Sequence, residues 1–247
     1  YQVSKELKKN GYKIKISEPD NNLEKIIKFF KPNVIFNALH GQFGEDGYIQ
    51  TILDKFNIPY THSGAIASSI AMDKEISKKL FIKNKIKTPK FFTYSYEETT
   101  SNLIKKINKK LRFPVVVKPL NEGSSVNVHI IGKKNLSKVI NKLKSYKKIL
   151  IEQFIGGREI QAAIMGDKKL GAIELIPKRK FYDYQAKYNS KANTKHIIPV
   201  DLPKIKLKKL MNIAFKAHKI IGCRGVTRSD FKFFKGDFYL LEINTQP

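Results

Sequence analysis

A group of acidic, amide and basic side chains near the end of the chain could bind a metal ion and a nucleotide. Two β-rich runs flank a turn centred on Gly236, which predicts a hairpin. If the pairing is symmetric about that glycine, Asp230 lies opposite Glu242, and Arg228 and Asn244 share their face because strand side chains alternate. Facing carboxylates repel unless they are neutralised, and Mg²⁺ prefers oxygen ligands. We therefore predict a magnesium–nucleotide site here; a solvated face with Arg228 as counter-ion is the alternative.

Lysines at two other points could contact phosphate groups. Lys118 ends the strongly apolar run that starts at Val115, and a loop with glycine and serine follows over 121–126. Such a loop can bring backbone N–H groups close to phosphate oxygens, although the spacing of a Walker loop is missing. Lys74 lies at the start of a predicted helix, where the helix dipole also favours an anion. An ordinary turn and a solvated lysine are the alternatives.

The segment Glu152-Gln153-Phe154-Ile155 closes a predicted strand and leads into a predicted connection between lobes. A hinge of this kind can offer backbone groups to an adenine edge, and the carboxylate of Glu159 could accept hydrogen bonds from a ribose hydroxyl pair. An ordinary crossover between strands is the competing interpretation.

Composition narrows the class of protein less than these motifs do. The chain has 247 residues, of which 41% are hydrophobic, enough to bury a core. No apolar run approaches the length of a membrane span, and no secretory pattern opens the chain. The formal net charge is +27, but the lysines are scattered and arginines are few, whereas nucleic-acid readers gather arginine and aromatic residues on one surface. We therefore predict a cytoplasmic protein that binds neither membrane nor nucleic acid; the single cysteine, Cys223, agrees with a reducing compartment.

The predicted elements that must position these residues form three blocks. In the first block, strands at 12–16, 34–37 and 58–60 with a helix at 23–30 predict βαβ units of a parallel sheet. This pattern starts in its middle, so we expect an initial strand to be absent from the sequence. The second block is predicted to contain the elements 73–83 (helix), 91–94 (strand), 97–110 (helix), 114–118 (strand), 126–131 (strand), 136–145 (helix) and 149–154 (strand). The third contains strands at 159–165 and 170–176, an irregular loop at 178–195, a helix at 206–221 and the closing hairpin.

These blocks predict a mixed α/β and α+β fold with packed lobes that share a cleft. We expect an N-terminal α/β substrate lobe at 1–62, a small central lobe at 63–155 and a C-terminal lobe with the metal site at 156–247.

The order and spacing of these motifs resemble those of the ATP-grasp ligases. Three further segments resemble the D-alanine–D-alanine ligase family: the loop 37–47 (Asn-Ala-Leu-His-Gly-Gln-Phe-Gly-Glu-Asp-Gly), the lid 181–188 (Phe-Tyr-Asp-Tyr-Gln-Ala-Lys-Tyr) and the terminal stretch 242–247. The resemblance covers essentially the whole chain and implies an ATP-grasp fold with an N-terminal parallel α/β domain, incomplete at both ends. Phe154 stands where many relatives have tryptophan, and Gln185 where many have glutamate.

The resemblance also implies site residues and partners. The implied ATP-binding residues are Lys74, Lys118, Glu122, Ser124, Ser125, Glu152, Phe154, Ile155, Glu159 and Lys187. The implied metal ligands, for two Mg²⁺ ions with Mn²⁺ as an alternative, are Asp230, Glu242 and Asn244. The implied catalytic and substrate-positioning residues are Arg228, His40, Ser124, Tyr188 and Glu45. The implied partners are two D-alanine molecules and, in a homodimer, a second copy of the chain.

The implied reaction starts when ATP phosphorylates the carboxylate of the first D-alanine, and the amine of the second D-alanine then attacks the acyl phosphate. Arg228 would stabilise the oxyanion that forms, and closing loops around Gly123 and Asp183 would exclude water. The product would serve peptidoglycan synthesis. The alternatives are an ATP-grasp ligase that joins D-alanine to D-lactate or another nucleophile, an ATP-binding pseudoenzyme and, from a different class, a non-catalytic polyanion-binding module.

Overall fold

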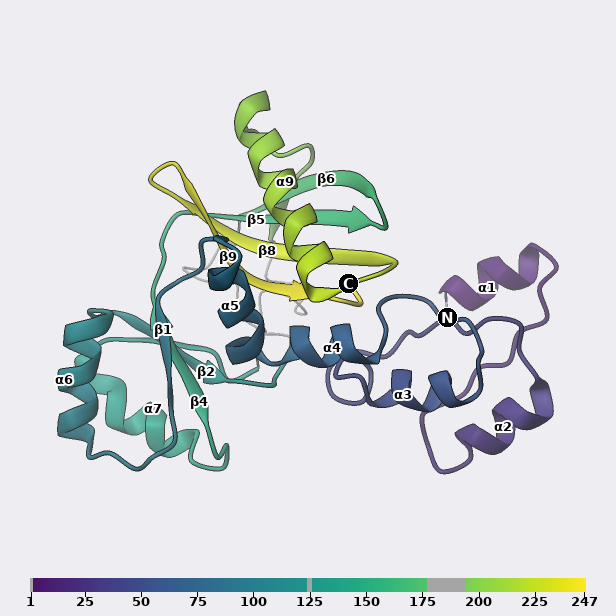
Figure 1. Cartoon of the computed structure of the whole chain (residues 1–247), viewed down its shortest axis with the longest axis horizontal. Coiled ribbons are helices and arrows are strands. Elements are labelled where there is room, and N and C mark those ends of the chain that lie inside the picture. Colours follow the sequence, from purple (N-terminus) through teal and green to yellow (C-terminus); the bar gives the residue numbers. More distant parts are fainter. Residues whose placement is uncertain (1, 124–125, 177–193) are drawn as a thin grey trace.

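Two antiparallel sheets and an N-terminal helical lobe make up the chain (Figure 1). The computed structural model describes residues 2–123, 126–176 and 194–247. Ser124, Ser125 and the predicted lid at 181–188 lie outside the described residues. None of the described helices has the length and apolar character that crossing a membrane requires.

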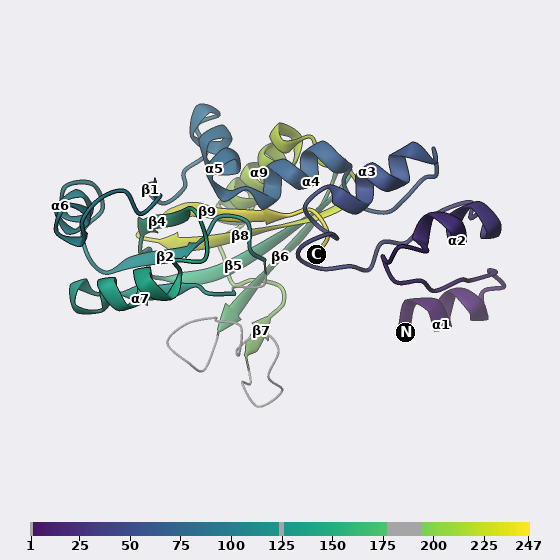
Figure 2. The same ribbon diagram turned by 90° about the horizontal axis from the view of Figure 1, so that it is seen from below.

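The N-terminal lobe lies at one end of the molecule, and the central sheet lies at the other (Figures 1 and 2). The predicted helix is present as α2 (Leu23–Phe30), and it is joined by α1 (Gln2–Lys9) and α3 (Tyr48–Lys55). The strand predicted at 12–16 does not form, and those predicted at 34–37 and 58–60 are reduced to a single bridge between Ile35 and Tyr60, which is parallel as predicted. A run with β propensity becomes a strand only when a neighbour completes its hydrogen-bond ladder, and the described residues supply no neighbour for 12–16.

The central sheet has the strand order β1-β4-β2-β3, and every neighbouring pair is antiparallel. The predicted second block is confirmed with shifted ends. For example, α6 starts after Thr99, whose side chain accepts a hydrogen bond from Asn102 N and so caps the helix. The elements are β1 (Phe91–Tyr94), α6 (Thr100–Lys110), β2 (Val115–Pro119), β3 (His129–Ile131), the 3-10 turn η1 (Lys133–Asn135), α7 (Leu136–Lys142) and β4 (Ile149–Gln153).

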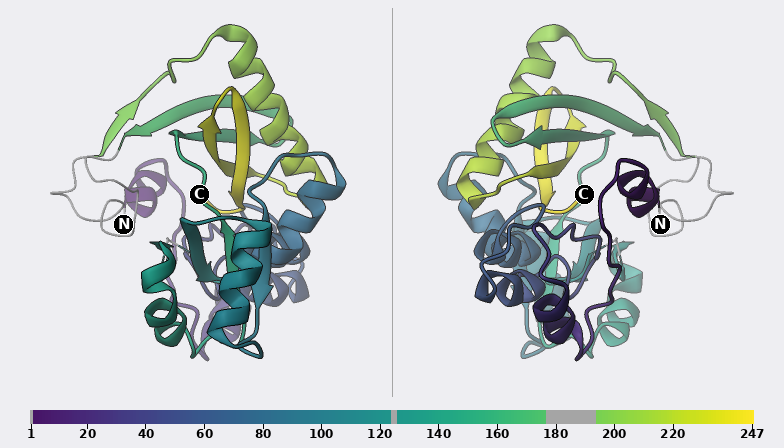
Figure 3. Two further views of the ribbon diagram at one scale, coloured as in Figure 1. Left: turned by 90° about the vertical axis from the view of Figure 1, so that its left-hand side faces the viewer. Right: turned by 90° about the vertical axis from the view of Figure 1, so that its right-hand side faces the viewer.

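The C-terminal sheet has the order β7-β6-β5-β8-β9 and lies above the central sheet in Figure 3. One of its faces is covered by α9, whose buried Leu210, Ala214, Ala217 and Ile221 recur at helical spacing. The elements are α4 (Ala65–Met72), α5 (Lys74–Lys83), β5 (Arg158–Met165), β6 (Lys168–Ile176), β7 (Lys195–Ile197), α9 (Lys204–Ile221), β8 (Val226–Phe234) and β9 (Asp237–Asn244).

Three apolar clusters correspond to the three predicted lobes, except that two helices of the predicted central lobe pack into the C-terminal cluster. Ala67 and Ala71 of α4 and Phe81 of α5 pack into the cluster of the C-terminal sheet, whereas the central cluster is built from α6, α7 and the central strands. A third cluster around Ile27 and Leu53 holds the N-terminal lobe. Helices α4 and α5 thus share the core of the C-terminal sheet, and the lobe boundaries at 62 and 155 stay predictions.

A bulge in the closing hairpin determines which side chains share its outer face. The turn residues Lys235 and Gly236 have φ values of 48° and 85°, as a two-residue type I′ turn requires. From this turn the register runs to Phe231 opposite Leu240, and then it shifts so that Asp230 faces Glu242. The predicted pairing of Asp230 with Glu242 is therefore correct, although the hairpin is not symmetric throughout. Without the extra residue, Glu242 would lie on the core face.

The connection between the two sheets gives the first prediction. At Gly157, with φ +86°, an added Cβ would lie 2.3 Å from the carbonyl oxygen of Phe233. We expect Gly157→Ala to lower the free energy of unfolding by more than roughly 2 kcal/mol, because left-handed strain and a backbone clash add. Gly222→Ala is the matched control: Gly222 has φ +78° and nothing within 4 Å, so we expect roughly 1–2 kcal/mol. Urea unfolding of both variants tests this, and equal losses would contradict it.

Candidate active site

A buried carboxylate on β4 holds two lysines. Glu152 pairs with Val116 in the β2–β4 register, so Lys118, two residues further on β2, lies on the same face. Lys118 Nζ is 2.6 Å from Glu152 Oε1, and Lys78 Nζ is 2.9 Å from Glu152 Oε2. Burial alone would raise the pKa of Glu152, but the two ammonium groups outweigh it and hold that pKa below its usual value. All three side chains of this cluster are buried.

Sequence reasoning missed Lys78, which lies one helical turn after Lys74 on α5. The helix starts at a capping residue, Asp73, which accepts hydrogen bonds from Glu75 N and Ile76 N. Lys78 is 0% exposed and donates to Thr88 Oγ1 at 2.8 Å. Burial lowers the pKa of Lys78 to about 8, against the attraction of Glu152. The spacing of four residues on one helix face was the only signal in the sequence, and other lysines share it.

Lys74 connects the loop after β2 to the closing hairpin. Its Nζ donates to the carbonyl oxygen of Glu122 at 2.6 Å and lies 3.8 Å from Glu242 Oε2. Burial lowers the pKa of Lys74, and Glu242 opposes that shift. Lys118 has the opposite balance: burial alone would lower its pKa, but Glu152 and Glu242 outweigh it and raise that pKa. The two predicted phosphate-binding lysines therefore share one electrostatic environment.

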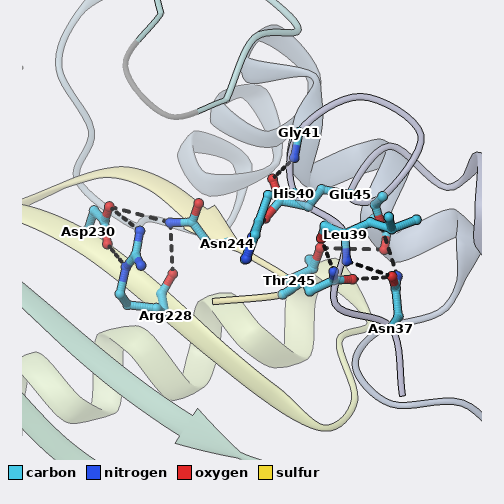
Figure 4. A network of polar contacts seen from close by, with 12 residues as sticks. Asn37, Leu39, His40, Gly41, Glu45, Arg228, Asp230, Asn244 and Thr245 are labelled. Carbon is cyan, nitrogen blue, oxygen red and sulfur yellow. Dashed lines mark hydrogen bonds and ion pairs between the residues drawn. The ribbon is translucent and has the colours of Figure 1, made fainter. Parts of the chain in front are cut away.

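The outer face of the hairpin carries Arg228 and the predicted metal ligands, of which Figure 4 shows Asp230 and Asn244. Arg228 donates to both carboxylate oxygens of Asp230, from Nε at 2.8 Å and from Nη2 at 3.2 Å. Asn244 Nδ2 lies 3.4 Å from Asp230 Oδ2. Glu242 completes the set from β9, opposite Asp230. The residues that the sequence placed on one face are brought together as predicted.

This donor set fits magnesium by its chemistry. Two carboxylates and an amide oxygen are hard ligands of the kind that Mg²⁺ binds, with phosphate oxygens and water completing the shell. Among the described residues no three aspartate, glutamate, histidine or cysteine side chains gather as a metal cluster, so Asn244 and a nucleotide would have to complete the coordination. The Asp230 carboxylate would then serve both the ion and Arg228, which donates to both of its oxygens.

The loop with the His-Gly motif reaches the same place from the N-terminal lobe. Glu45 Oε2 accepts a hydrogen bond from Gly41 N at 3.0 Å, and Glu45 Oε1 is 3.6 Å from Nδ1 of the exposed His40. An added Cβ at Gly123 would lie 3.5 Å from Glu45 Oε2, so the glycine of the loop after β2 is in direct reach of Glu45. One small pocket is lined by Glu45, Lys74, Glu122, Gly123, Glu242 and Asn244, among others.

The residues after β9 fasten this loop, a contact that the sequence did not reveal. Asn37 Nδ2 donates to Gln246 Oε1 at 2.6 Å, and Gln246 Nε2 donates to the carbonyl of Leu39. Thr245 Oγ1 lies 3.4 Å from Ser68 Oγ on α4. Figure 4 shows the loop beside the end of the hairpin. The segment read as a terminal signature thus holds His40 and Glu45 against the site.

The predicted adenine and ribose residues follow β4. Ile155 is buried and Phe154 half-buried, and Glu159 on β5 faces Lys232 on β8 with Oε2 2.8 Å from Nζ. Lys232 is two residues from Asp230 on β8, so the two side chains point to the same face. Glu159 therefore lies on the same side of the sheet as the hairpin site. Ser124, Ser125, Lys187 and Tyr188 lie outside the residues that the structure describes.

Two antiparallel sheets, with Lys118 on the central sheet, Lys74 on helix α5 and an acid–amide hairpin in the C-terminal sheet, define the class of ATP-grasp ligases. Family models described as the D-ala D-ala ligase C-terminus and N-terminus match residues 80–247 and 2–63. The chain belongs to the D-alanine–D-alanine ligase family.

Individual relatives agree with this assignment. The D-alanine–D-alanine ligase of Pelagibacter ubique is 71% identical over 246 residues, which are 100% of this chain and 81% of that protein. The enzyme of Zymomonas mobilis is 42% identical over 99% of this chain and 77% of its own length. The crystal structure of the Bacillus anthracis ligase complexed with ATP has a TM-score of 0.80 at 28% identity and covers 97% of this chain and 77% of its own.

The buried carboxylate gives a stability prediction. Glu152→Gln leaves two buried ammonium groups without their counter-charge, so we expect the free energy of unfolding to fall by about 3–5 kcal/mol. Asp237→Asn is the control, because its ion pair with Lys87 is exposed and should contribute little. Denaturant unfolding at neutral pH measures both; similar losses would refute the assignment.

The same substitution has a pH signature. Because the folded-state pKa of Glu152 is lowered from 4.5, its contribution is present above that pH and is lost as the pH falls through the lowered value. We expect Glu152→Gln to remove this part of the acid dependence of unfolding.

Proposed function

We propose that the chain joins two D-alanine molecules at this cleft with the hydrolysis of ATP to ADP and phosphate, and so supplies the dipeptide for peptidoglycan synthesis. The observation that carries the proposal is the convergence of Asp230, Glu242 and Asn244 on one face of the hairpin, with Lys74 reaching from Glu242 to the loop after β2. Membership of the ligase family supports the reaction class.

The nucleotide would lie between the two sheets. Lys74 and Lys118 are proposed to bind the α- and β-phosphates, since both ammonium groups are buried and both are attracted by the carboxylate of Glu242. The proposed adenine and ribose contacts come from Glu152, Phe154, Ile155 and Glu159. The remaining proposed nucleotide-binding residues are Glu122, Ser124 and Ser125 in the loop after β2 and Lys187 in the lid.

Magnesium, or manganese in its place, would be held by Asp230, Glu242 and Asn244, and when bound it would offset the charge of the transferring phosphoryl group. Arg228 is held on the same face by Asp230. Its guanidinium is proposed to stabilise the oxyanion that forms when the amine of the second D-alanine attacks the acyl phosphate of the first.

Substrate positioning is assigned to the loop from the N-terminal lobe and to the lid. His40 would approach the first D-alanine, Glu45 would support the loop through Gly41 N, and Tyr188 would contact the second substrate. The acyl phosphate is sensitive to hydrolysis, so loops that exclude water are part of the proposal. The homodimer expected from the resemblance and the cytoplasmic location expected from composition stay predictions.

Substitution of the metal ligand tests the proposal. We expect Asp230→Asn to lower the rate of ADP release with ATP, Mg²⁺ and D-alanine roughly 100-fold or more, because it removes a charged ligand and the partner of Arg228. Asp237→Asn at the far end of the same hairpin should keep the wild-type rate. A coupled ADP-release assay that compares D-alanine with L-alanine and D-lactate measures this, and normal turnover of Asp230→Asn would remove the metal assignment.

Acceptor preference tests the role of the lid. We expect a Tyr188→Phe variant to change the ratio of D-alanine to D-lactate used as second substrate, since the phenol is proposed to contact the acceptor. Product analysis by mass spectrometry in mixtures of the two acceptors gives the ratio. An unchanged ratio would exclude Tyr188 as a specificity residue.

A further inference from the structure

Lys78 is a buried charge that the proposed chemistry does not use. Its side chain is among the largest that are fully buried, at 0% exposure. Its ammonium group contacts Glu152 Oε2 at 2.9 Å and Thr88 Oγ1 at 2.8 Å, and it lies 5.8 Å from the ring centroid of Phe91. Phe91 and Glu152 lie on strands of the central sheet, and Thr88 lies just before the first of them. Helix α5, which carries Lys78, packs instead into the core of the C-terminal sheet.

Charge balance alone does not explain this lysine. Lys118 already pairs with Glu152 at 2.6 Å, so one buried carboxylate faces one buried ammonium group without Lys78. A second buried ammonium group leaves an excess positive charge, and a hydrophobic side chain of similar volume would satisfy packing at no greater cost. The charged groups that act on Lys78 are Glu152 on β4, Lys118 on β2 and, from further away, Glu242 on β9. An anion that enters the cleft would remove the excess.

We infer that Lys78 is a positioning residue for ATP. It binds Oε2 of Glu152, while Lys118 binds Oε1, and so it fixes the orientation of Glu152 and Lys118 toward the nucleotide. Its charge leaves the cluster net positive and ready for polyphosphate. Because it reaches from α5 to β4, it also ties the helix that carries Lys74 to the sheet that carries Lys118. The inference rests on the proposed function, in which these residues bind ATP.

Three variants of the full chain test the inference. Lys78→Met keeps the unbranched shape and most of the length of the side chain and removes its charge. Lys78→Arg keeps the charge. Lys79→Met changes the next residue, whose side chain is 66% exposed and pairs with Glu75. The ATP dissociation constant is measured by calorimetry, and the KM for ATP, the KM for D-alanine and kcat by ADP release.

We expect Lys78→Met to weaken ATP binding about tenfold or more, as loss of a charged hydrogen-bonding group does. The KM for ATP should rise with it, while the KM for D-alanine stays near the wild-type value. Lys78→Arg should restore much of the affinity, and Lys79→Met should behave as wild type. A purely structural lysine would lower the unfolding midpoint without this selective effect on ATP.

Wild-type ATP affinity in a folded Lys78→Met variant would overturn the inference and leave the proposed function intact. Should Lys78→Met fail to fold, Thr88→Val carries the test, because it removes one partner of the ammonium group and keeps the charge; we expect ATP affinity to fall at least threefold or so, and an unchanged affinity overturns the inference. Failure of the proposed function has a different signature, since the wild-type chain would then neither bind ATP nor release ADP with D-alanine, and the inference would fall with it.

Discussion

Compensation of buried charge is the constraint on which the rest of the site depends. Glu152 lies inside the protein and would be strongly unfavourable there without the ammonium groups of Lys118 and Lys78 on its two oxygens. These lysines come from a strand of the central sheet and from a helix that packs with the C-terminal sheet. One carboxylate therefore fixes the position of two structural units, and the cleft between them is where the polar residues of the site meet.

The acidic side of the cleft is built by a local irregularity. The bulge after Asp230 turns Glu242 and Asn244 outward and leaves Leu240 and Ile243 in the core. Packing and chemistry are satisfied together by one extra residue, since a regular hairpin would bury the glutamate among apolar side chains. The hairpin then presents its negative charge to the buried lysines. Lys74 makes this contact directly, because its ammonium group lies near Glu242 and also donates to the carbonyl oxygen of Glu122 in the loop after β2.

Contacts between residues far apart in the sequence hold the loop of the N-terminal lobe against the site. Gln246 hydrogen-bonds Asn37 and Leu39, and Glu45 supports the backbone of its own loop next to Gly123. The large net charge of +27 comes from many lysines scattered along the chain, whereas the site lysines that the structure describes, Lys74, Lys78 and Lys118, are buried. Function in this chain follows from where charge is enclosed more than from how much there is.

The sequence by itself determined most elements of the central and C-terminal lobes, although not α4 or β7. It also determined the face shared by Asp230 and Glu242 and the family, because these rest on local periodicity and ordered motifs. It failed at the strands near Tyr12 and Val34, where apolar and β-branched residues predicted ladders that need partners. Only the tertiary structure decided that Lys78 is buried on Glu152, that the hairpin is bulged and that Gln246 fastens Asn37. Each of these is a contact between elements distant in sequence, and neither the spacing of one lysine among many nor a symmetric turn contains that information.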